Sequence, residues 1–395
     1  PMLAPIGCSD GADGLKRTPT GDGPVVIVDW DAKPLPEVPF PTDLATRADP
    51  FSPTGLRVNI SEEASTELER KARRKINTLS GFGIYAPITV SFDAALDLDN
   101  IVARHPDDGD FSDDAFLVID VTPGSPTYLQ PADLDVGHGR FPQDVANSRA
   151  YFPNDPHADM PSLLFDTTYE DLNGNGVLDP GEDIDNDGDL DVSNVYPEGG
   201  DPREDLLTWY ERVSNTLILR PVVPLREETT YAVVLTERLT DAEGAPVRSP
   251  WDWVNHTRQT QTLQPLADAL PNHGLTIDDI GFAWTFTTGR VTGDLVDIRR
   301  SLDGEGPWSF LPEDYPPEIH TAEQMHDSAT LGDPYSLPVN TLVGIIAAAG
   351  LVDADVVGAL QAGYSYGRGM VGGQFTSPNL LADRDDGGRD SVDEW

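Results

Sequence analysis

The run Phe282-Ala283-Trp284-Thr285-Phe286-Thr287 alternates bulky aromatic side chains with smaller ones. A period of two residues is typical of a β-strand that buries one face, because successive side chains point to opposite sides of the sheet. We therefore expect a strand here whose aromatic residues form the core of the fold.

Other segments on the way to the N-terminus have the same character. Apolar residues alternate in Ile88-Thr89-Val90-Ser91-Phe92, and the run from 116 to 121 is densely apolar. Further strands are predicted at 25–28, 216–219 and 231–235, with a turn at Asp241-Ala242-Glu243-Gly244. Together with 36 glycines and 35 prolines, this spacing predicts a mainly β protein, an antiparallel β-sandwich with peripheral helices.

The clearest predicted helix spans residues 61–79. Ser61 can cap it, and the first turn is acidic, whereas the basic residues of 70–75 approach the negative C-terminal end. Ala64, Leu68, Ala72 and Ile76 recur every four residues and predict one buried face. The basic cluster could indicate an anionic partner, but a solvated helix face explains it as well.

The charge balance of the 395 residues is extreme, with 26 basic and 68 acidic side chains and a formal net charge of -42. Binding to nucleic acid requires clusters of Lys and Arg, so we expect no nucleic-acid partner. Solubility or a saline habitat would also explain the acidity. No apolar run approaches the ~20 residues that span a bilayer.

The single cysteine, Cys8, lies in Leu3-Ala4-Pro5-Ile6-Gly7-Cys8-Ser9-Asp10. This segment resembles a bacterial lipoprotein cleavage site, in which a small residue precedes a cysteine that becomes lipidated; Pro5 departs from the usual aliphatic residue. We expect any membrane attachment to occur only through a lipid at Cys8. The alternative is an unmodified cysteine in a disordered tail.

Residues 171–182 match the spacing of the twelve-residue EF-hand loop. Calcium takes six to eight oxygen ligands, and such a loop supplies them from positions 1, 3, 5, 7, 9 and 12, with glycine at position 6 for the sharp turn. Five ligands are predicted to be side chains, those of Asp171, Asn173, Asn175, Asp179 and Glu182. At position 7 the predicted ligand is the backbone carbonyl of Val177, and Gly176 forms the turn.

A second acidic loop follows directly. Its predicted ligands are Asp183, Asp185, Asp187, Asp189 and Asp191. Its twelfth position is Asn194, which cannot act as a bidentate carboxylate, so weaker binding, a shared site or merely a solvated acidic loop are the alternatives. Without flanking amphipathic helices, the pair predicts a structural calcium site rather than a calcium sensor.

Several segments resemble known families. Residues 88–93, 215–225, 229–236 and 282–288 resemble bacterial Ig-like domains of the surface-layer type. Phe40-Pro41-Thr42-Asp43-Leu44, Leu79-Ser80-Gly81-Phe82 and the segments 291–299 and 375–381 are similar to the N-terminal region of secreted virulence-factor-type lipases. The resemblance implies an Ig-like region that precedes an α/β-hydrolase domain.

One motif suggests catalysis, namely Gly363-Tyr364-Ser365-Tyr366-Gly367, which matches the G-x-S-x-G nucleophile elbow. An elbow follows a buried strand, whereas residues 354–361 here have a helical pattern, and no histidine follows His326. A small serine hydrolase that uses Ser365 is therefore a minor alternative, and we expect no catalytic residue in this chain. His320 and His326 lack the spacing of a helical zinc pair.

These observations predict four regions: a flexible tether over residues 1–23, an extension with one helix over 24–82, an Ig-like sandwich over 83–290 with a calcium-binding insertion at about 166–201, and a helical linker with the start of a further region over 291–395. The expected function is a non-catalytic calcium-binding N-terminal region of a surface or secreted bacterial lipase- or esterase-like lipoprotein, with calcium ions and a C-terminal hydrolase domain of the same polypeptide as partners. The alternative is a stand-alone calcium-stabilised Ig-like adhesion or ligand-binding module.

Overall fold

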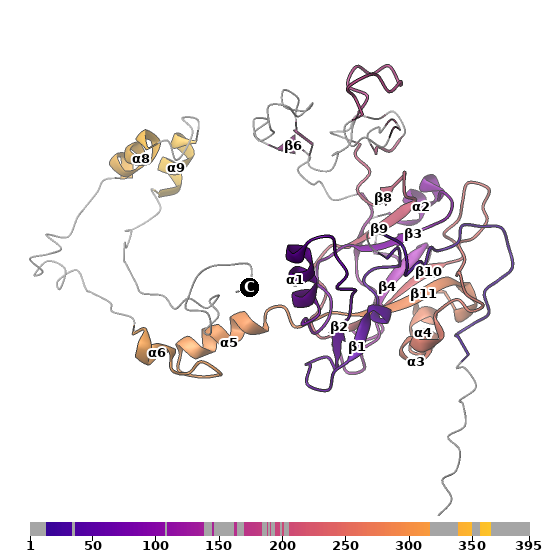
Figure 1. The fold of residues 1–395 in the computed structure, drawn as a ribbon, viewed down its shortest axis with the longest axis horizontal. Helices are drawn as coiled ribbons and strands as arrows, with labels where there is room; N and C mark the ends of the chain where they lie inside the picture. Colours follow the sequence, from indigo (N-terminus) through magenta and orange to yellow (C-terminus); the bar gives the residue numbers. More distant parts are fainter. Residues whose placement is uncertain are drawn as a thin grey trace, which may run out of the picture. The chain divides into compact units, whose positions relative to one another are not determined.

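The computed structural model describes most of the first 316 residues and two later helices (Figure 1). The described residues are 13–33, 36–106, 109–137, 144–145, 162–163, 170–183, 188, 190, 194–197, 200, 205–316, 339–349 and 356–364. The chain divides into two compact units, Pro1–Val291 and Thr292–Trp395.

We expected a mainly β fold. The described residues instead combine antiparallel strands with short helices, so the fold is mixed. The strands are β1 Thr46–Ala48, β2 Leu56–Val58, β3 Ile88–Ser91, β4 Phe116–Asp120, β5 Leu134–Asp135, β6 Asp144–Val145, β7 Ser162–Leu163, β8 Tyr210–Glu211, β9 Thr216–Pro221, β10 Thr230–Thr236 and β11 Ile280–Thr287. The helices of the first unit are η1 Asp43–Ala45, α1 Glu67–Ile76, α2 Leu98–Arg104, η3 Thr257–Gln259, α3 Thr260–Leu263, α4 Leu266–Ala269, η4 Leu270–His273 and η5 Ile277–Asp279.

Three strands predicted from the sequence form the central sheet, in the order β11-β10-β4. All pairs are antiparallel, and Val233 of β10 lies opposite Trp284 on one side and Val118 on the other. The ladder between β10 and β11 shifts register between Leu235 and Thr236, where β10 ends and β11 begins. The alternating segment that contains Trp284 is therefore an edge strand of the sheet, paired with β10 at every residue except Gly281.

A second antiparallel sheet has the order β3-β9-β5, and β8 also pairs with β9. Its register places Ile88 opposite Leu219 and Val90 opposite Leu217. The buried side chains alternate with half-buried ones along β3 and β9, as the sequence pattern predicted for strands with one buried face. Two small antiparallel pairs, β1-β2 and β6-β7, complete the strands.

The two sheets share one hydrophobic core. Alternate residues of β10 and β11, including Val233 and Trp284, belong to the same buried cluster as Val90 and Leu217 of the second sheet. The opposite face of the central sheet is also covered: Val234 and its neighbours pack against Leu263, Leu266 and Leu270. Figure 1 shows α3 and α4 beside β11.

This second layer corrects the sequence prediction for residues 282–287. All eight residues of β11 are buried, not only the aromatic ones, because the helices α3 and α4 cover the face that we expected to be exposed. The spacing of Leu263, Leu266 and Leu270 is that of one face of a helix, and this signal could have predicted the layer.

The chain passes from one sheet to the other just after β4. Ala132 donates its backbone N–H to the carbonyl of Val118 in the first sheet at 2.8 Å, and Leu134 pairs with Pro221 of β9 in the second. The segment 129–135 therefore joins the β4 edge of one sheet to the β5 edge of the other.

Residues 13–23 differ from the tether that we expected. The backbone N–H of Leu15 donates to Oδ1 of Asn255 at 2.8 Å, Lys16 forms an ion pair with Glu237 at 2.6 Å, and Val254 donates its N–H to the carbonyl of Lys16. This part of the chain is held along the loop before η3 by specific polar contacts. Residues 1–12, including Cys8, lie outside the described residues.

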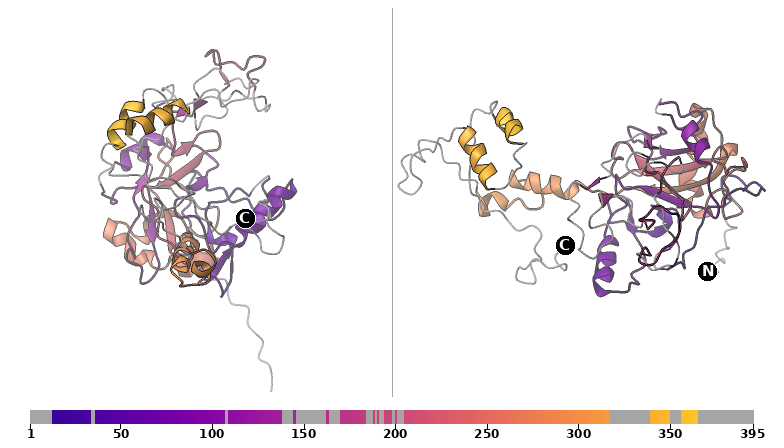
Figure 2. Two further views of the ribbon diagram at one scale, coloured as in Figure 1. Left: turned by 90° about the vertical axis from the view of Figure 1, so that its left-hand side faces the viewer. Right: turned by 90° about the horizontal axis from the view of Figure 1, so that it is seen from above.

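Helix α1 is shorter than predicted and turns a different face to the protein. It begins at Glu67 with Thr66 as its N-cap, not Ser61. Leu68 and Ile76 are 58% and 40% exposed, whereas Arg73 is buried and bonded to Glu69 at 2.6 Å. The prediction of a buried apolar face was wrong, because α1 stands at the margin of its unit in both views of Figure 2.

The second unit contains helices, as expected for residues 291–395. They are α5 Gly293–Leu302, α6 Leu311–Asp314, α8 Val339–Ala348 and α9 Val357–Tyr364. In the described part of the chain, no helix combines the length and the apolar character needed to cross a membrane.

Candidate calcium loop and polar pocket

The predicted first calcium loop, Asp171 to Glu182, lies wholly within the described residues. Gly176, at position 6, has a φ of 70°, a left-handed conformation that side chains with a Cβ rarely adopt. The chain therefore makes the sharp turn at the place where an EF-hand loop requires it.

Side chains at both ends of the loop bond to its backbone. The Asp171 carboxylate accepts from the N–H groups of Asn175 and Gly176 at 2.9 and 2.8 Å. The Glu182 carboxylate accepts from the N–H of Asp179 at 2.9 Å. These bonds turn the carboxylates of positions 1 and 12 toward the loop.

Three side chains meet between these ends. The amide groups of Asn173 and Asn175 each donate to Oδ2 of Asp179 at 2.8 Å, and these two bonds lower the pKa of the Asp179 carboxyl. Positions 3, 5 and 9 of the predicted ligand set are thus brought together. Val177 at position 7 is bonded through its N–H to Oδ1 of Asn175 at 2.8 Å.

The charge of this loop is not balanced by basic residues. Asp171 and Glu182 are buried, and Oδ1 of Asp183 is buried without a hydrogen-bond partner. Among the described residues, none of these three carboxylates forms an ion pair with Lys, Arg or His. Buried carboxylates are costly unless a cation or several donors compensate them.

The described residues hold no group of three or more His, Cys, Asp or Glu side chains arranged to bind a metal. In the first loop, half of the predicted donors are of other kinds, since Asn173 and Asn175 offer amide oxygens and Val177 a carbonyl. A cation there would bind a mixed oxygen set, as calcium does in EF-hand loops.

The second loop is described only in part. Asp183, Gly188 and Leu190 are described, whereas Asp185, Asp187, Asp189 and Asp191 lie outside the described residues. The position-12 side chain has another role: the Asn194 amide donates to the carbonyls of Leu207 and Tyr210 at 2.9 and 2.6 Å. Asn194 therefore anchors the chain to β8.

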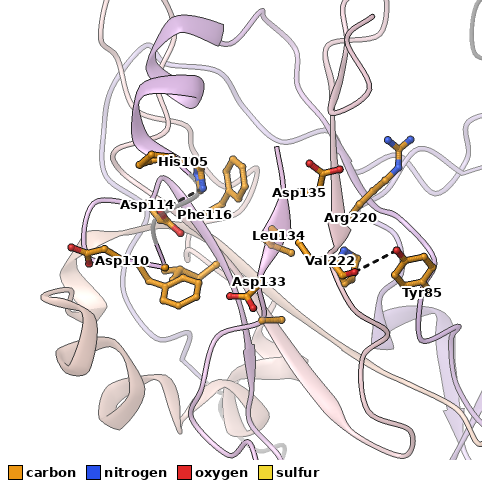
Figure 3. Close-up of a pocket in the computed structure, with 16 residues that line it drawn as sticks. Tyr85, His105, Asp110, Asp114, Phe116, Asp133, Leu134, Asp135, Arg220 and Val222 are labelled. Atoms are coloured by element: carbon orange, nitrogen blue, oxygen red, sulfur yellow. Dashed lines mark hydrogen bonds and ion pairs between the residues drawn. The ribbon is translucent and has the colours of Figure 1, made fainter. Parts of the chain in front are cut away.

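A pocket of about 550 Å³ opens between the edges of the two sheets (Figure 3). The residues that line it are Tyr85, His105, Pro106, Gly109, Asp110, Phe111, Asp114, Phe116, Leu117, Ala132, Asp133, Leu134, Asp135, Arg220, Pro221 and Val222. They come from four separate parts of the sequence, namely Tyr85, residues between 105 and 117, residues 132–135 and residues 220–222, which is why the sequence pattern did not reveal the pocket. The crossing segment contributes Ala132, Asp133, Leu134 and Asp135 to its lining.

The left wall in Figure 3 contains a buried histidine, His105, stacked on Phe116 with ring centroids 3.8 Å apart. Its Nε2 accepts from the N–H of Ala115 at 3.1 Å, so the ring proton is on Nδ1, which faces Asp114 Oδ1 at 3.5 Å. Burial first, and then the charge of Arg104, lower the pKa of His105 from 6.5 to about 3. The ring is therefore neutral at physiological pH and positions Asp114.

The opposite wall carries Arg220 and Asp135 (Figure 3). The Arg220 guanidinium donates to the carbonyl of Thr208 at 2.7 Å. Burial lowers the pKa of Arg220, while the charge of Asp135 acts in the opposite direction. Tyr85 flanks this wall and donates to the carbonyl of Val222 at 3.5 Å.

Another buried carboxyl lies away from the pocket. Asp43 accepts from the hydroxyls of Thr285 and Thr287 at 3.2 and 3.0 Å, but its Oδ1 is buried without a partner. Burial raises the pKa of Asp43 from 3.8 to about 6. This residue belongs to the segment 40–44, which resembles the N-terminal region of secreted lipases, and the Trp284 indole donates to the Pro41 carbonyl in the same segment at 2.9 Å.

The remaining sequence hypotheses concern Cys8 and Ser365, and both residues lie outside the described part of the chain. Helix α9 ends at Tyr364, directly before Ser365. A nucleophile elbow is preceded by a strand, so the described residues before Ser365 have the wrong secondary structure for that motif.

Comparison with known proteins gives no further assignment: no family model matches the chain, and neither a curated protein nor a solved structure is similar to it. The chemical assignment therefore depends on the loop and the pocket.

Proposed function

We propose that this chain is a calcium-binding, Ig-like β region in which the loop from Asp171 to Glu182 holds a structural calcium ion. The observation that carries the proposal is the group of carboxylates Asp171, Glu182 and Asp183: the first two are buried, Oδ1 of Asp183 is buried without a hydrogen-bond partner, and no basic side chain among the described residues pairs with them. A divalent cation would neutralise these carboxylates and supply the missing partner of Asp183 Oδ1.

The donor set fits calcium better than a softer metal. Carboxylate, amide and carbonyl oxygens are hard ligands, and the predicted set in the first loop contains no imidazole or thiol. The left-handed turn at Gly176 and the inward hydrogen bonds of Asp171 and Glu182 support a preformed loop. The proposed role of calcium is to stabilise the folded loop, not to carry out chemistry.

Calorimetric titration of the chelator-treated full chain with calcium tests this assignment. We expect saturable binding, with a Kd on the order of 0.1–1 mM as in extracellular modules. Glu182→Gln, which removes a charged oxygen at the bidentate position, should weaken binding about tenfold. Glu243→Gln, on the exposed turn before Ala245, is the matched control and should leave the affinity unchanged.

Absence of calcium binding at millimolar concentrations would refute the proposal, as would an equal loss of affinity in both variants. Asn194 is not a suitable control residue, because its side chain bonds to Leu207 and Tyr210 and its loss would disturb the fold.

In this proposal the two sheets form an Ig-like sandwich that presents the calcium loop at a bacterial surface, anchored by a lipid at Cys8, in a lipase- or esterase-like protein. Their shared core supports the sandwich assignment. Membrane fractionation with a lipoprotein signal in place tests the anchor: Cys8→Ser should move the protein to the soluble fraction, and identical fractionation would contradict it.

The proposal assigns no catalytic role to Ser365. The chain should not hydrolyse p-nitrophenyl esters above background, and hydrolysis that Ser365→Ala abolishes would require a different function.

A further inference from the structure

We propose that the pocket between the β4 and β5 edges binds a small organic cation with two or more amino groups, of the diamine or polyamine class. The pocket is separate from the calcium loop, and this inference does not depend on calcium binding. Its volume of about 550 Å³ lies within the range of small-molecule sites, roughly 300–1,000 Å³.

The lining favours a cation over a neutral or anionic ligand. Four aspartates face the pocket, Asp110, Asp114, Asp133 and Asp135, against one arginine. The histidine adds no charge at physiological pH, because burial lowers the pKa of His105 to about 3. A pocket with this excess of negative charge attracts cations and disfavours anions.

The distribution of the carboxylates favours a ligand with separated charges. Asp110 and Asp114 lie on one side of the pocket, Asp135 lies on the other, and Asp133 lies between them (Figure 3). They are too dispersed for one metal ion, in agreement with the absence of a metal-binding group among the described residues. Amino groups at two ends of a flexible chain can bond to carboxylates on both sides.

The remaining lining suits the carbon chain of such a ligand. Phe111, Leu134 and Val222 are apolar, and Tyr85 presents an aromatic ring that is 56% exposed. Methylene groups pack on apolar surface, and an ammonium group is attracted to an aromatic face. Asp110 and Asp133 are both exposed, so they can be substituted without disturbing the core.

The pocket is also held in shape before a ligand arrives. The Asp114 wall is fixed by His105, whose Nε2 accepts from Ala115, and the Arg220 wall by the bond to Thr208. Preorganised walls reduce the entropic cost of binding. Asp110 and Asp133 would supply charge and Asp114 would orient the ligand, whereas the charge of Asp135 also acts on Arg220.

Calorimetric titration of the full chain with spermidine, in saturating calcium so that the loop is occupied, tests the proposal. We expect saturable binding that weakens as salt is added, because the carboxylates are only partly shielded from solvent. The double variant Asp110→Asn/Asp133→Asn should weaken binding about tenfold, as expected for the loss of two partly screened ion pairs. Tyr85→Ala should weaken binding by a smaller factor of about three.

The control is a double variant that removes the same charge elsewhere, Glu243→Gln/Asp252→Asn; the Asp252 side chain is 87% exposed. An equal loss in both double variants would mean that spermidine binds the acidic surface in general and would overturn the proposal. If maltose binds in the same pocket as tightly as spermidine, the cation proposal is also overturned, in favour of a site for a neutral carbohydrate. Retained affinity in the control and loss in the pocket variant would support it.

Discussion

The central sheet and the calcium loop are stabilised by opposite means. In β4, β10 and β11 every residue except Thr230 is buried, and both faces of the sheet are covered by apolar side chains. In the loop from Asp171 to Glu182, the order comes from side chain–backbone hydrogen bonds around buried carboxylates. The first region should be insensitive to the removal of ions, whereas the second should depend on a cation.

The largest effect should come from the core of the sheet. Trp284 is 1% exposed and its indole bonds to Pro41, so Trp284→Ala should lower the free energy of unfolding by about 3–5 kcal/mol through the cavity it leaves. Denaturant unfolding measures this, with Val213→Ala as control because Val213 is 82% exposed. A loss below about 1 kcal/mol would show that this face of the sheet is not the centre of the core.

A smaller effect should come from Asp43, the carboxyl that adjoins the sheet. Its pKa is raised to about 6 in the folded protein, so its protonated form is favoured by folding. Its contribution to stability is present below a pH of about 4 and is lost as the pH rises through about 6; a shift of two pKa units corresponds to about 3 kcal/mol. The sheet is thus not wholly independent of pH.

Unfolding of the wild type and of Asp43→Asn between pH 4 and pH 8 checks this point. The stability difference between them should change in favour of the variant as the pH rises, whereas Asp31→Asn, at an exposed position, should track the wild type. A difference that is the same at every pH would contradict the role of Asp43.

Removal of calcium should affect the loop and spare the sheets. Binding to the folded form alone stabilises by about 2.7 kcal/mol at a hundredfold excess of ligand over Kd, and this gain can be confined to one segment. Limited proteolysis in a chelator should therefore cut within residues 166–201 before it cuts near Ile88 or Trp284. If proteolysis gives the same fragments at the same rates with and without calcium, the loop does not depend on calcium more than the sheets do.

The smallest effect is expected at helix α1. Leu68 is 58% exposed, so Leu68→Gln should change the free energy of unfolding by less than about 0.5 kcal/mol. Arg73→Ala should cost more, about 1 kcal/mol, because Arg73 is buried and bonded to Glu69 and to the carbonyl of Ser61. If the two losses were reversed, α1 would bury the face that its sequence pattern predicted.

The sequence was most informative where the pattern is local. The strands at 88–91, 216–221, 230–236 and 280–287 follow from alternation of their side chains, and the turn at Gly176 follows from EF-hand spacing. Burial of the second face of β11 depends on residues 263–270, so the alternation within 282–287 could not indicate it.

The sequence predictions were wrong where neighbouring elements, rather than the local pattern, determine which side chains are buried. In α1, the pattern correctly indicated a helix but not which face would be covered, since Leu68 is 58% exposed while Arg73 is buried and bonded to Glu69. Likewise, the pocket brings Tyr85 and Arg220 together from positions far apart in the sequence, and no spacing rule connects them. Asp43 lies in a segment that resembles the lipase N-terminal region, but its raised pKa follows only from its burial in the folded protein.

The pairing of residues 15–18 with residues 251–255 also sets the order of events during synthesis. The first of these segments leaves the ribosome more than 200 residues before its partner, and β4 must likewise wait for β10 and β11. The β core therefore cannot close until about residue 287 has been translated, and its earlier apolar strands remain without their partners until then. During that interval the large excess of acidic residues gives the nascent chain a repulsive charge, which opposes its association with other copies.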